Sequence, residues 1–189
     1  MTDSPNTSAT GIQLIANQSL QFANPVAGIQ MAVLPIAGAA WIDTDDGVVV
    51  IDTLIGERAA RQMFERIKGQ IKYIIYTHGH LDHVGGTAAL MRDSPVVIAS
   101  DYLPDRLDSY KMLAQHRARI SAQQFNLPED PERFAGSLQR VVYPTETFIG
   151  TRTISLGNRT FELRTARAET DDVCWVWIPE LKAAFIGDR

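Results

Sequence analysis

Short apolar runs separated by turn residues dominate the first third of the chain, a pattern typical of β-strands. Three such runs predict strands over residues 29–36, 39–43 and 48–51. Asp45-Asp46-Gly47 predicts a hairpin turn, because glycine tolerates the positive φ angle of tight turns, and Asn24-Pro25 predicts a break before the first strand. Over residues 57–68 apolar side chains instead recur every three or four positions and predict an amphipathic helix.

The remaining sequence alternates these two patterns. It predicts a strand over residues 72–76, helices over 86–92 and 102–125, a loop over 126–136, and further strands over 95–99, 141–143, 151–156, 160–163, 173–178 and 183–186. Strands in this order with few helices predict an α+β fold, in which two mixed β-sheets pack face to face and are flanked by helices. Residues 1–11 are polar and predict a disordered tail, whereas residues 12–189 predict one domain.

Candidate chemistry is concentrated directly after the strand at residues 72–76. Three of the four histidines lie within six positions, in the sequence His78-Gly79-His80-Leu81-Asp82-His83. Side chains two apart on an extended backbone point the same way, so His78 and His80 can converge on one point. The chain must then turn, which lets Asp82 and His83 reach a second point close by. Neutral imidazole and carboxylate are usual ligands of zinc and related ions, so this spacing predicts two neighbouring metal ions.

This His-x-His-x-Asp-His sequence resembles the signature of the metallo-β-lactamase superfamily. The resemblance implies the αββα sandwich of that superfamily, incomplete here at its C-terminal end, which agrees with the architecture that the strand pattern predicts. It also implies a hydrolase with two Zn²⁺ ions, which share a bridging water and lower its pKa so that hydroxide attacks the substrate at neutral pH. Asp82 would help to hold that hydroxide while it binds its metal ion.

Two downstream sequences offer further ligands. The stretch from Ala166 to Asp172, followed by Trp-Val-Trp, resembles the alkylsulfatase branch of the superfamily, which has glycine where this chain has Ala168. The resemblance makes Glu169 the third ligand of the ion held by His78 and His80, whereas composition alone would place it in an acidic, solvated loop. Gly-Asp188 resembles the superfamily sequence whose carboxylate bridges both ions, although the alkylsulfatase branch tends to carry glutamate there.

Other residues carry smaller expectations. Asp52 resembles a family position and either orients the metal loop through hydrogen bonds or is a plain turn residue. Thr77 and Thr87 are candidates to brace that loop. We interpret His116, on a polar helix face, as a surface or pocket-rim residue rather than a ligand. Cys174, beside two tryptophans in a predicted strand, is interpreted as a core residue rather than a thiolate ligand.

The alkylsulfatase resemblance implies a small-molecule substrate, an alkyl sulfate ester, whose sulfate group would need a cationic partner. Arg117, Arg119 and Arg167 are open candidates for that partner. One alternative is a hydrolase of the same superfamily that acts on a lactone, thioester or β-lactam. Another is a catalytically incomplete fragment or non-catalytic remnant, because the superfamily supplies a final histidine from beyond the bridging carboxylate and this chain ends at Arg189. We therefore expect weak metal binding and low activity from these 189 residues alone.

Composition limits the other partners. The net charge is −4 and lysine and arginine form no cluster, which argues against nucleic acid. No apolar run approaches the ~20 residues of a membrane helix, and the polar start contains no secretory signal, so we expect a soluble, cytoplasmic protein. The single cysteine excludes an internal disulfide. If the strand at residues 173–178 lacks a neighbour, its open edge would favour association into a homo-oligomer.

Overall fold

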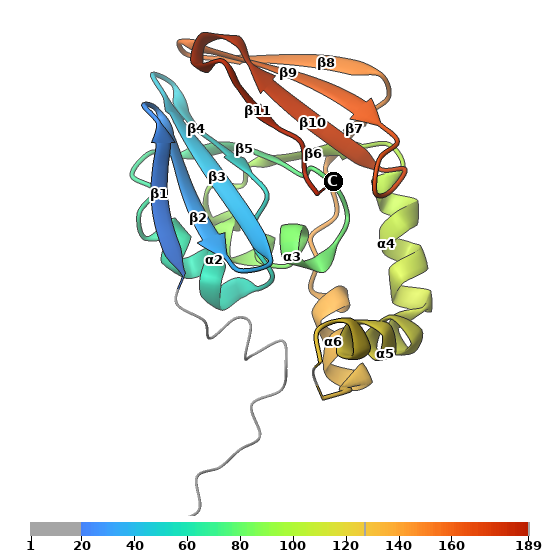
Figure 1. Ribbon diagram of the computed structural model, residues 1–189. Coiled ribbons are helices and arrows are strands. Elements are labelled where there is room, and N and C mark those ends of the chain that lie inside the picture. Colours follow the sequence, from blue (N-terminus) through green and yellow to red (C-terminus); the bar gives the residue numbers. More distant parts are fainter. Residues whose placement is uncertain (1–19, 127, 189) are drawn as a thin grey trace, which may run out of the picture.

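The structure is a computed structural model and describes residues 20–126 and 128–188. Its strands form a seven-stranded and a four-stranded sheet that pack face to face, and the helices pack on the other side of the larger sheet (Figure 1). The predicted α+β architecture of two packed sheets with helices is confirmed. The tail predicted over residues 1–11 lies outside the described residues.

The larger sheet has its strands in sequence order: β1 (Gln21–Val26), β2 (Ile29–Leu34), β3 (Ala37–Thr44), β4 (Gly47–Ile51), β5 (Ile71–Ile75), β6 (Val96–Ser100) and β7 (Glu146–Phe148). The pairs from β1 to β4 are antiparallel and those from β4 to β7 are parallel. The smaller sheet has the order β11 (Ala183–Phe185), β10 (Val173–Ile178), β9 (Arg159–Ala166) and β8 (Thr151–Leu156). Its pairs are all antiparallel, so only the larger of the two sheets is mixed.

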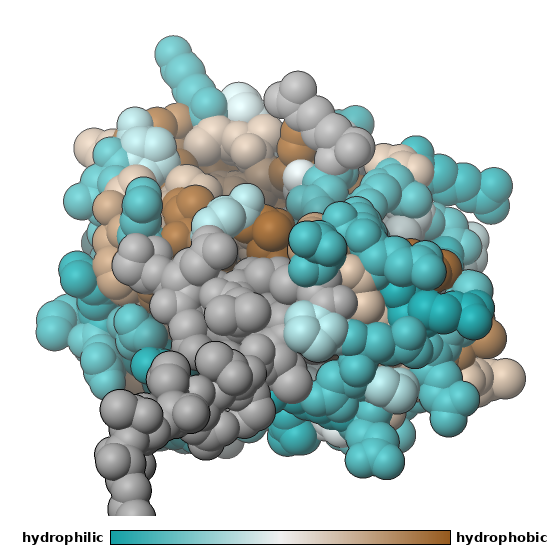
Figure 2. Space-filling model, turned by 60° about the horizontal axis from the view of Figure 1, so that its bottom comes forward, coloured by the Kyte–Doolittle hydropathy of each residue, from teal (hydrophilic) through white to brown (hydrophobic). Residues whose placement is uncertain are grey.

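All the helices but the last follow strands of the larger sheet, and the last one joins β10 to β11. The helices are α2 (Glu57–Phe64), α3 (Leu81–Val84), the 3₁₀ helix η1 (Thr87–Asp93), α4 (Leu103–Met112), α5 (Ala114–Gln124), α6 (Pro131–Gln139) and the 3₁₀ helix η2 (Pro179–Leu181). Within the described residues, no helix combines the length and apolar character needed to cross a membrane. The end of the molecule that Figure 2 brings forward is mostly hydrophilic, with hydrophobic side chains gathered near the middle of the view.

Alternating side chains of the larger sheet build two separate cores. In β4, Val48 and Val50 point to the helices, whereas Val49 and Ile51 point to the smaller sheet. The inner face of the smaller sheet, which includes Phe161, packs against Val49 and Ile51 in the second core. This period-two alternation explains why β4 reads as a continuous apolar run, because both of its faces are buried.

Two predictions of chain breaks were wrong for reasons that proline explains. Residues 126–136 were predicted as a loop, but α6 begins at Pro131, where a helix needs no backbone N–H donor. The side chain of Asp130 caps that helix by accepting a hydrogen bond from the backbone N–H of Arg133 at 3.1 Å. Asn24-Pro25 does not precede the sheet but lies inside β1, an edge strand whose register shifts between Ala23 and Val26. An edge strand tolerates proline because one side of its backbone needs no partner.

Two further elements differ from the sequence prediction. The helix predicted over residues 102–125 divides into α4 and α5 at Leu113, whose φ of −97° and ψ of 17° depart from helical values. The strand predicted over residues 141–143 is irregular, and the sheet is instead extended by β7. Val141 is buried there, so the apolar residues at 141–143 reflect burial in the core and not pairing in a sheet.

Candidate metal centre

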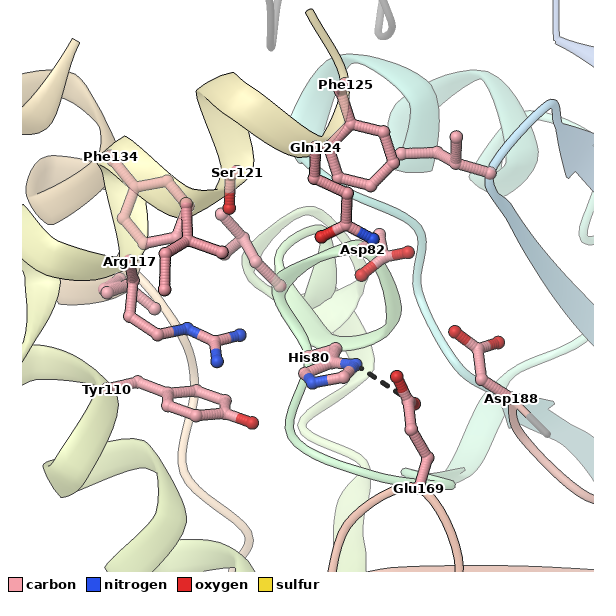
Figure 3. A pocket seen from close by; sticks show the side chains of 14 residues that line it. His80, Asp82, Tyr110, Arg117, Ser121, Gln124, Phe125, Phe134, Glu169 and Asp188 are labelled. Atoms are coloured by element: carbon pink, nitrogen blue, oxygen red, sulfur yellow. Dashed lines mark ion pairs between the residues drawn. The ribbon is translucent and has the colours of Figure 1, made fainter. Parts of the chain in front are cut away.

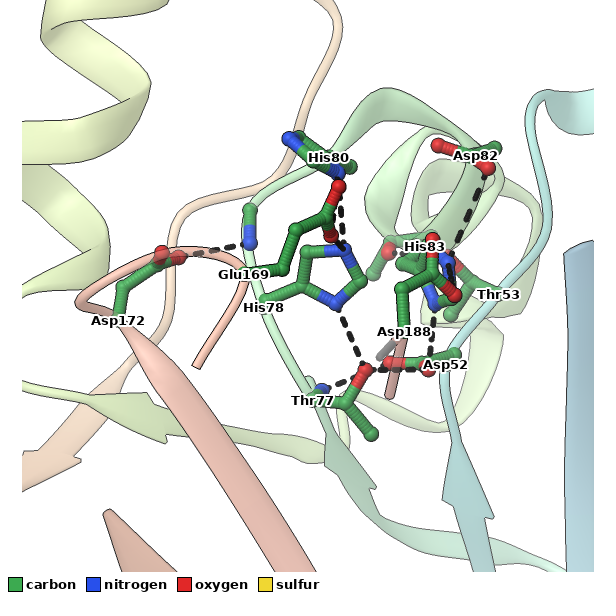
Figure 4. A network of polar contacts seen from close by, with 12 residues as sticks. Asp52, Thr53, Thr77, His78, His80, Asp82, His83, Glu169, Asp172 and Asp188 are labelled. Atoms are coloured by element: carbon green, nitrogen blue, oxygen red, sulfur yellow. Dashed lines mark hydrogen bonds and ion pairs between the residues drawn. The ribbon is translucent and has the colours of Figure 1, made fainter. Parts of the chain in front are cut away.

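The histidine loop begins where β5 ends and leads into the single turn of α3. His78 is fully buried and Nε2 of its ring lies 3.0 Å from Nδ1 of His80. The predicted convergence of these two imidazoles is therefore present in the structure. Asp82 and His83 follow within α3, so the turn of the helix carries them away from the first pair (Figure 4).

Two acids from the smaller sheet meet this loop. Glu169, between β9 and β10, places Oε2 3.4 Å from Nδ1 of His80 and 3.6 Å from Nε2 of His78. Asp188, after β11, places Oδ1 3.3 Å from Nε2 of His83, and Oδ2 of Asp82 lies 3.8 Å from the same nitrogen. All the residues that the sequence assigned to the two ions thus lie together.

These side chains form two groups that could each hold a metal ion. One contains His78, His80, Glu169 and Asp188, and the other contains Asp82, His83 and Asp188. Within each group the donor atoms lie within 4.8 Å of one another. Nε2 of His83 is buried and makes no hydrogen bond with any described residue, which is the state expected of a nitrogen that binds a metal ion.

Asp52 orients this loop from the end of the neighbouring strand. β4 and β5 are parallel, so the residue after β4 lies beside the residues after β5. The Asp52 carboxylate accepts hydrogen bonds from the backbone N–H of Thr77 at 2.8 Å, from the Thr77 hydroxyl at 2.7 Å and from Nδ1 of His83 at 2.8 Å. The sequence left open whether Asp52 orients the metal loop through hydrogen bonds or is a plain turn residue, and these contacts confirm the first interpretation.

The two threonines also brace the loop. Thr77 Oγ1 donates to Asp52 and lies 3.1 Å from Nδ1 of His78, so Nε2 of that histidine faces His80 and Glu169. Thr87 Oγ1 contacts the hydroxyl of Thr53 at 2.9 Å and accepts a hydrogen bond from the Tyr76 hydroxyl at 2.7 Å. These buried contacts fix the two ends of the loop.

Asp172 supports the histidine loop, a role that the sequence did not predict for it. It is fully buried, and its Oδ2 accepts a hydrogen bond from the backbone N–H of Gly79 at 2.7 Å. Cys174 adds a second link, since its backbone N–H donates to the Thr77 carbonyl at 2.6 Å. The segment that carries Glu169 is therefore tied directly to the backbone of the histidine loop.

Burial and neighbouring charges set the protonation of the histidines. Burial, and then the charge of His83, lowers the pKa of His78 to about 4, and burial also lowers the pKa of His80. Burial acts in the same direction on His83, but the carboxylates of Asp52 and Asp188 outweigh it and raise the pKa of His83 to about 11. In the absence of metal, His78 and His80 are neutral at pH 7, whereas His83 carries a proton that a metal ion would displace.

A cavity of about 460 Å³ opens beside the ligand groups (Figure 3). The ligand side of its wall consists of His80, Asp82, Glu169 and Asp188. The opposite side comes mainly from α5 and α6 and their flanks, and includes Arg117, Ile120, Phe125 and Phe134. A substrate in this cavity would lie directly against the candidate metal centre.

Neither His116 nor Cys174 joins the ligand groups that the described residues form. His116 lies on the exposed face of α5, with Nδ1 3.2 Å from Nη2 of Arg119. Cys174 is buried between the two sheets, and burial raises the pKa of its thiol to about 12. Both positions agree with the interpretations of a surface histidine and a core cysteine.

Parts of the chain are similar in sequence to known proteins. The chain is 36% identical over 83 residues to a hydroxyacylglutathione hydrolase of Prochlorococcus marinus, which covers 43% of this chain and 31% of that protein. It is 33% identical over 72 residues to an (R)-specific secondary-alkylsulfatase of a Pseudomonas species, covering 35% of this chain and 11% of that protein. The chain therefore matches less than a third of the length of each of these relatives.

Solved structures share the fold at lower identity. The stereoselective inverting sec-alkylsulfatase Pisa1 from Pseudomonas sp. superposes with a TM-score of 0.69 at 20% identity, covering 89% of this chain and 31% of that one. A metallo-β-lactamase from Cronobacter sakazakii superposes with a TM-score of 0.64 at 18% identity, covering 88% and 60%. A family model described as the metallo-beta-lactamase superfamily matches residues 39–188, from β3 to the second acid of the site, and the chain thus belongs to the metallo-β-lactamase superfamily.

Proposed function

We propose that this chain is a metal-dependent hydrolase that holds two zinc ions and cleaves an alkyl sulfate ester. The observation that carries the proposal is the position of Asp188, which belongs to both groups of ligand-type side chains. A carboxylate shared in this way suits a bridging ligand between two neighbouring ions. Membership of a superfamily of hydrolases gives the reaction class.

The donor set fits two zinc ions. His78, His80 and Glu169 would hold one ion, Asp82 and His83 the other, and Asp188 both. Imidazole nitrogens and carboxylate oxygens are zinc ligands, and the buried Nε2 of His83, which makes no hydrogen bond with a described residue, would be such a ligand once its proton is displaced. When bound, two zinc ions would lower the pKa of a bound water to ~7 and act as Lewis acids on the ester.

The chain's own residues prepare this site. Asp52 accepts the Nδ1–H of His83, which fixes the tautomer in which Nε2 carries a lone pair toward the centre. Asp82 lines the cavity, and its carboxylate is placed to accept a hydrogen bond from a water there and so to orient that water for attack. Burial raises the pKa of the Asp82 carboxyl, and the charge of His83 beside it acts in the opposite direction.

The substrate class rests on the residues around Glu169. They resemble the alkylsulfatase branch, and an alkylsulfatase is among the proteins to which the chain is similar in both sequence and fold. A thioester is the second candidate, because the hydroxyacylglutathione hydrolase relative is 36% identical over its matched part. Glutamate at position 169, where most of the superfamily places histidine, favours the sulfate ester.

The metal centre is tested by zinc affinity, measured by competition with a chelator. His78→Ala removes a ligand, whereas His116→Ala removes an exposed histidine outside both groups and is its matched control. We expect His78→Ala to weaken zinc binding at least ~10-fold relative to His116→Ala. Equal affinities in two folded variants would contradict the proposed centre.

The reaction is tested with a panel of esters on the zinc-loaded chain. We expect inorganic sulfate to be released from octyl sulfate, and the release to be lost in His78→Ala but kept in His116→Ala. Cleavage of a thioester without sulfate release would replace the first candidate by the second. Zinc binding without turnover of any ester, lactone or β-lactam in the panel would instead support a non-catalytic remnant of the fold.

A further inference from the structure

The cavity beside the metal centre has two walls of opposite character, and Arg117 belongs to the wall opposite the ligands. One wall carries the acidic ligands, and the other carries apolar side chains of α5, α6 and their flanks, among them Ile120, Phe125 and Phe134. Ile120 and Phe125 are 44% and 40% exposed and line the cavity together with the buried Phe134, an arrangement that suits contact with an apolar ligand.

Arg117 is the single lysine or arginine among the described residues that line this cavity. Its guanidinium packs on the ring of Tyr110, with the central carbon 4.0 Å from the ring centroid, and it forms no ion pair with a described residue. The same ring stacks near His80, at 5.9 Å between centroids and 20° between planes. Figure 3 shows the guanidinium lying above Tyr110 and pointing across the cavity toward His80.

The other arginines considered for this role are placed differently. Arg119 lies beside His116, in a separate depression at the surface of α5. Arg167 does not line the cavity. Arg106 approaches the Tyr110 ring at 5.8 Å, but its guanidinium pairs with Asp171 and Asp172. The structure therefore leaves Arg117 as the cationic group available to a ligand.

We propose that Arg117 selects the substrate by pairing with its anionic head group, while an apolar tail lies along Ile120, Phe125 and Phe134. This inference rests on the proposed hydrolase function and assigns the recognition of the substrate's anionic group to Arg117. An anionic head group suits this position because Arg117 is the one lysine or arginine among the described residues that line the cavity, and it has no ion-pair partner among them. The planar guanidinium, backed by Tyr110, presents its N–H groups to the oxygens of a sulfate.

The test is a binding measurement that needs no turnover. Octyl sulfonate has the head and tail of octyl sulfate but a carbon–sulfur bond that an esterase reaction cannot cleave. Its affinity for the zinc-loaded chain is measured by calorimetry below its micelle concentration, next to methyl sulfonate and octanol. We expect octyl sulfonate to bind more tightly than either, because only it contacts both Arg117 and the apolar side chains. Absence of binding to the unsubstituted chain at millimolar concentration would overturn the proposal.

Variants assign the effect to one side chain. We expect Arg117→Gln to weaken octyl sulfonate binding about 10-fold or more and to leave octanol binding unchanged, whereas Arg119→Gln, on the same helix, should change neither. Arg117→Lys should restore part of the loss, since it keeps the charge but not the planar fork. Zinc content and unfolding midpoint are measured for each variant. Equal affinities of Arg117→Gln and Arg119→Gln would overturn the proposal.

The two proposals fail in different ways. If octyl sulfonate binds through Arg117 but no alkyl sulfate is hydrolysed, the anion-selecting role stands and the sulfatase function is wrong. If octyl sulfate is hydrolysed with the same KM by Arg117→Gln and by the unsubstituted chain, the function stands and the role of Arg117 is wrong.

Discussion

Replacing Asp52 by asparagine should weaken zinc binding although Asp52 is not a proposed ligand. Oδ1 of Asp52 accepts the backbone N–H of Thr77, and Oδ2 accepts both the Thr77 hydroxyl and Nδ1 of His83. Asparagine has one oxygen, so no orientation of its amide can serve all three donors. If the oxygen faces Thr77 N–H, the amide NH₂ opposes the imidazole N–H; in the other orientation it opposes the backbone N–H.

The magnitude follows from the burial of this pair. The side chains of Asp52 and His83 are 6% and 5% exposed, so an opposed donor finds no water to replace its partner. Leaving one buried donor unpaired costs about 1–3 kcal/mol. The imidazole can avoid this cost by moving its proton to Nε2, but Nε2, the nitrogen that faces the centre, then has no lone pair for a metal ion. We therefore expect zinc affinity to fall about 10–100-fold, or roughly 1.4–2.7 kcal/mol.

The assay is zinc affinity by chelator competition, together with urea unfolding of the metal-free variants. Asp93→Asn is the matched control, because Asp93 accepts the backbone N–H of Ile71 at 3.0 Å at the opposite end of β5 and belongs to neither ligand group. Asp93→Asn should leave zinc affinity unchanged within about threefold. The reasoning is refuted if Asp52→Asn is folded and binds zinc as tightly as this control.

Three further predictions follow from the same geometry. The pKa of His83 is raised to about 11 in the metal-free chain, so zinc binding at pH 8 should release about one proton from this residue. The released proton is measured as a dependence of the calorimetric heat of binding on the ionisation enthalpy of the buffer. A heat that does not depend on the buffer would contradict this prediction. Gly187→Ala should lower zinc affinity, and it should lower the unfolding free energy by about 1–2 kcal/mol. Gly187 has a φ of +65°, and a Cβ there would lie 3.1 Å from Oγ1 of Thr77 and 3.2 Å from Nδ1 of His78. Unchanged zinc affinity and unfolding free energy would contradict this prediction. Tyr76→Phe should cost about 1–3 kcal/mol in urea unfolding with little change in zinc affinity, because the buried hydroxyl bonds a threonine and a main-chain carbonyl outside both ligand groups.

The ligand residues could be predicted because their spacing is set by local backbone geometry. His78 and His80 are two positions apart in extended chain, and Asp82 and His83 stand one helical turn away, so sequence distance translates directly into direction. Glu169 and Asp188 could not be derived in this way. They come from loops of the other sheet, and only the resemblance to a known family predicted that they lie beside the histidines.

The errors arose where one residue type has two structural meanings. Pro131 lies in the stretch predicted as a loop, because proline is common in loops, but proline is also favoured at the first position of a helix. Residues 141–143 carry the apolar content of a strand, yet Val142 uses its carbonyl to accept a hydrogen bond from the Tyr76 hydroxyl at 2.9 Å. Asp172 could not be separated from its exposed neighbour Asp171 by sequence, because only tertiary packing makes one of them buried.

The hydrogen bonds that brace the histidine loop hold its backbone and the Nδ1 side of two of its imidazoles. Thr77 is held by its backbone N–H and carbonyl, and Gly79 by its backbone N–H, through Asp52, Cys174 and Asp172. The imidazoles are oriented through Nδ1 of His78 and of His83, so that Nε2 of each faces the centre. Two of these braces come from the smaller sheet, so the packing of the sheets both delivers the acids and fixes the histidines that they meet. Because folding has already ordered the loop, little of the binding energy of an ion needs to be spent on arranging its ligands.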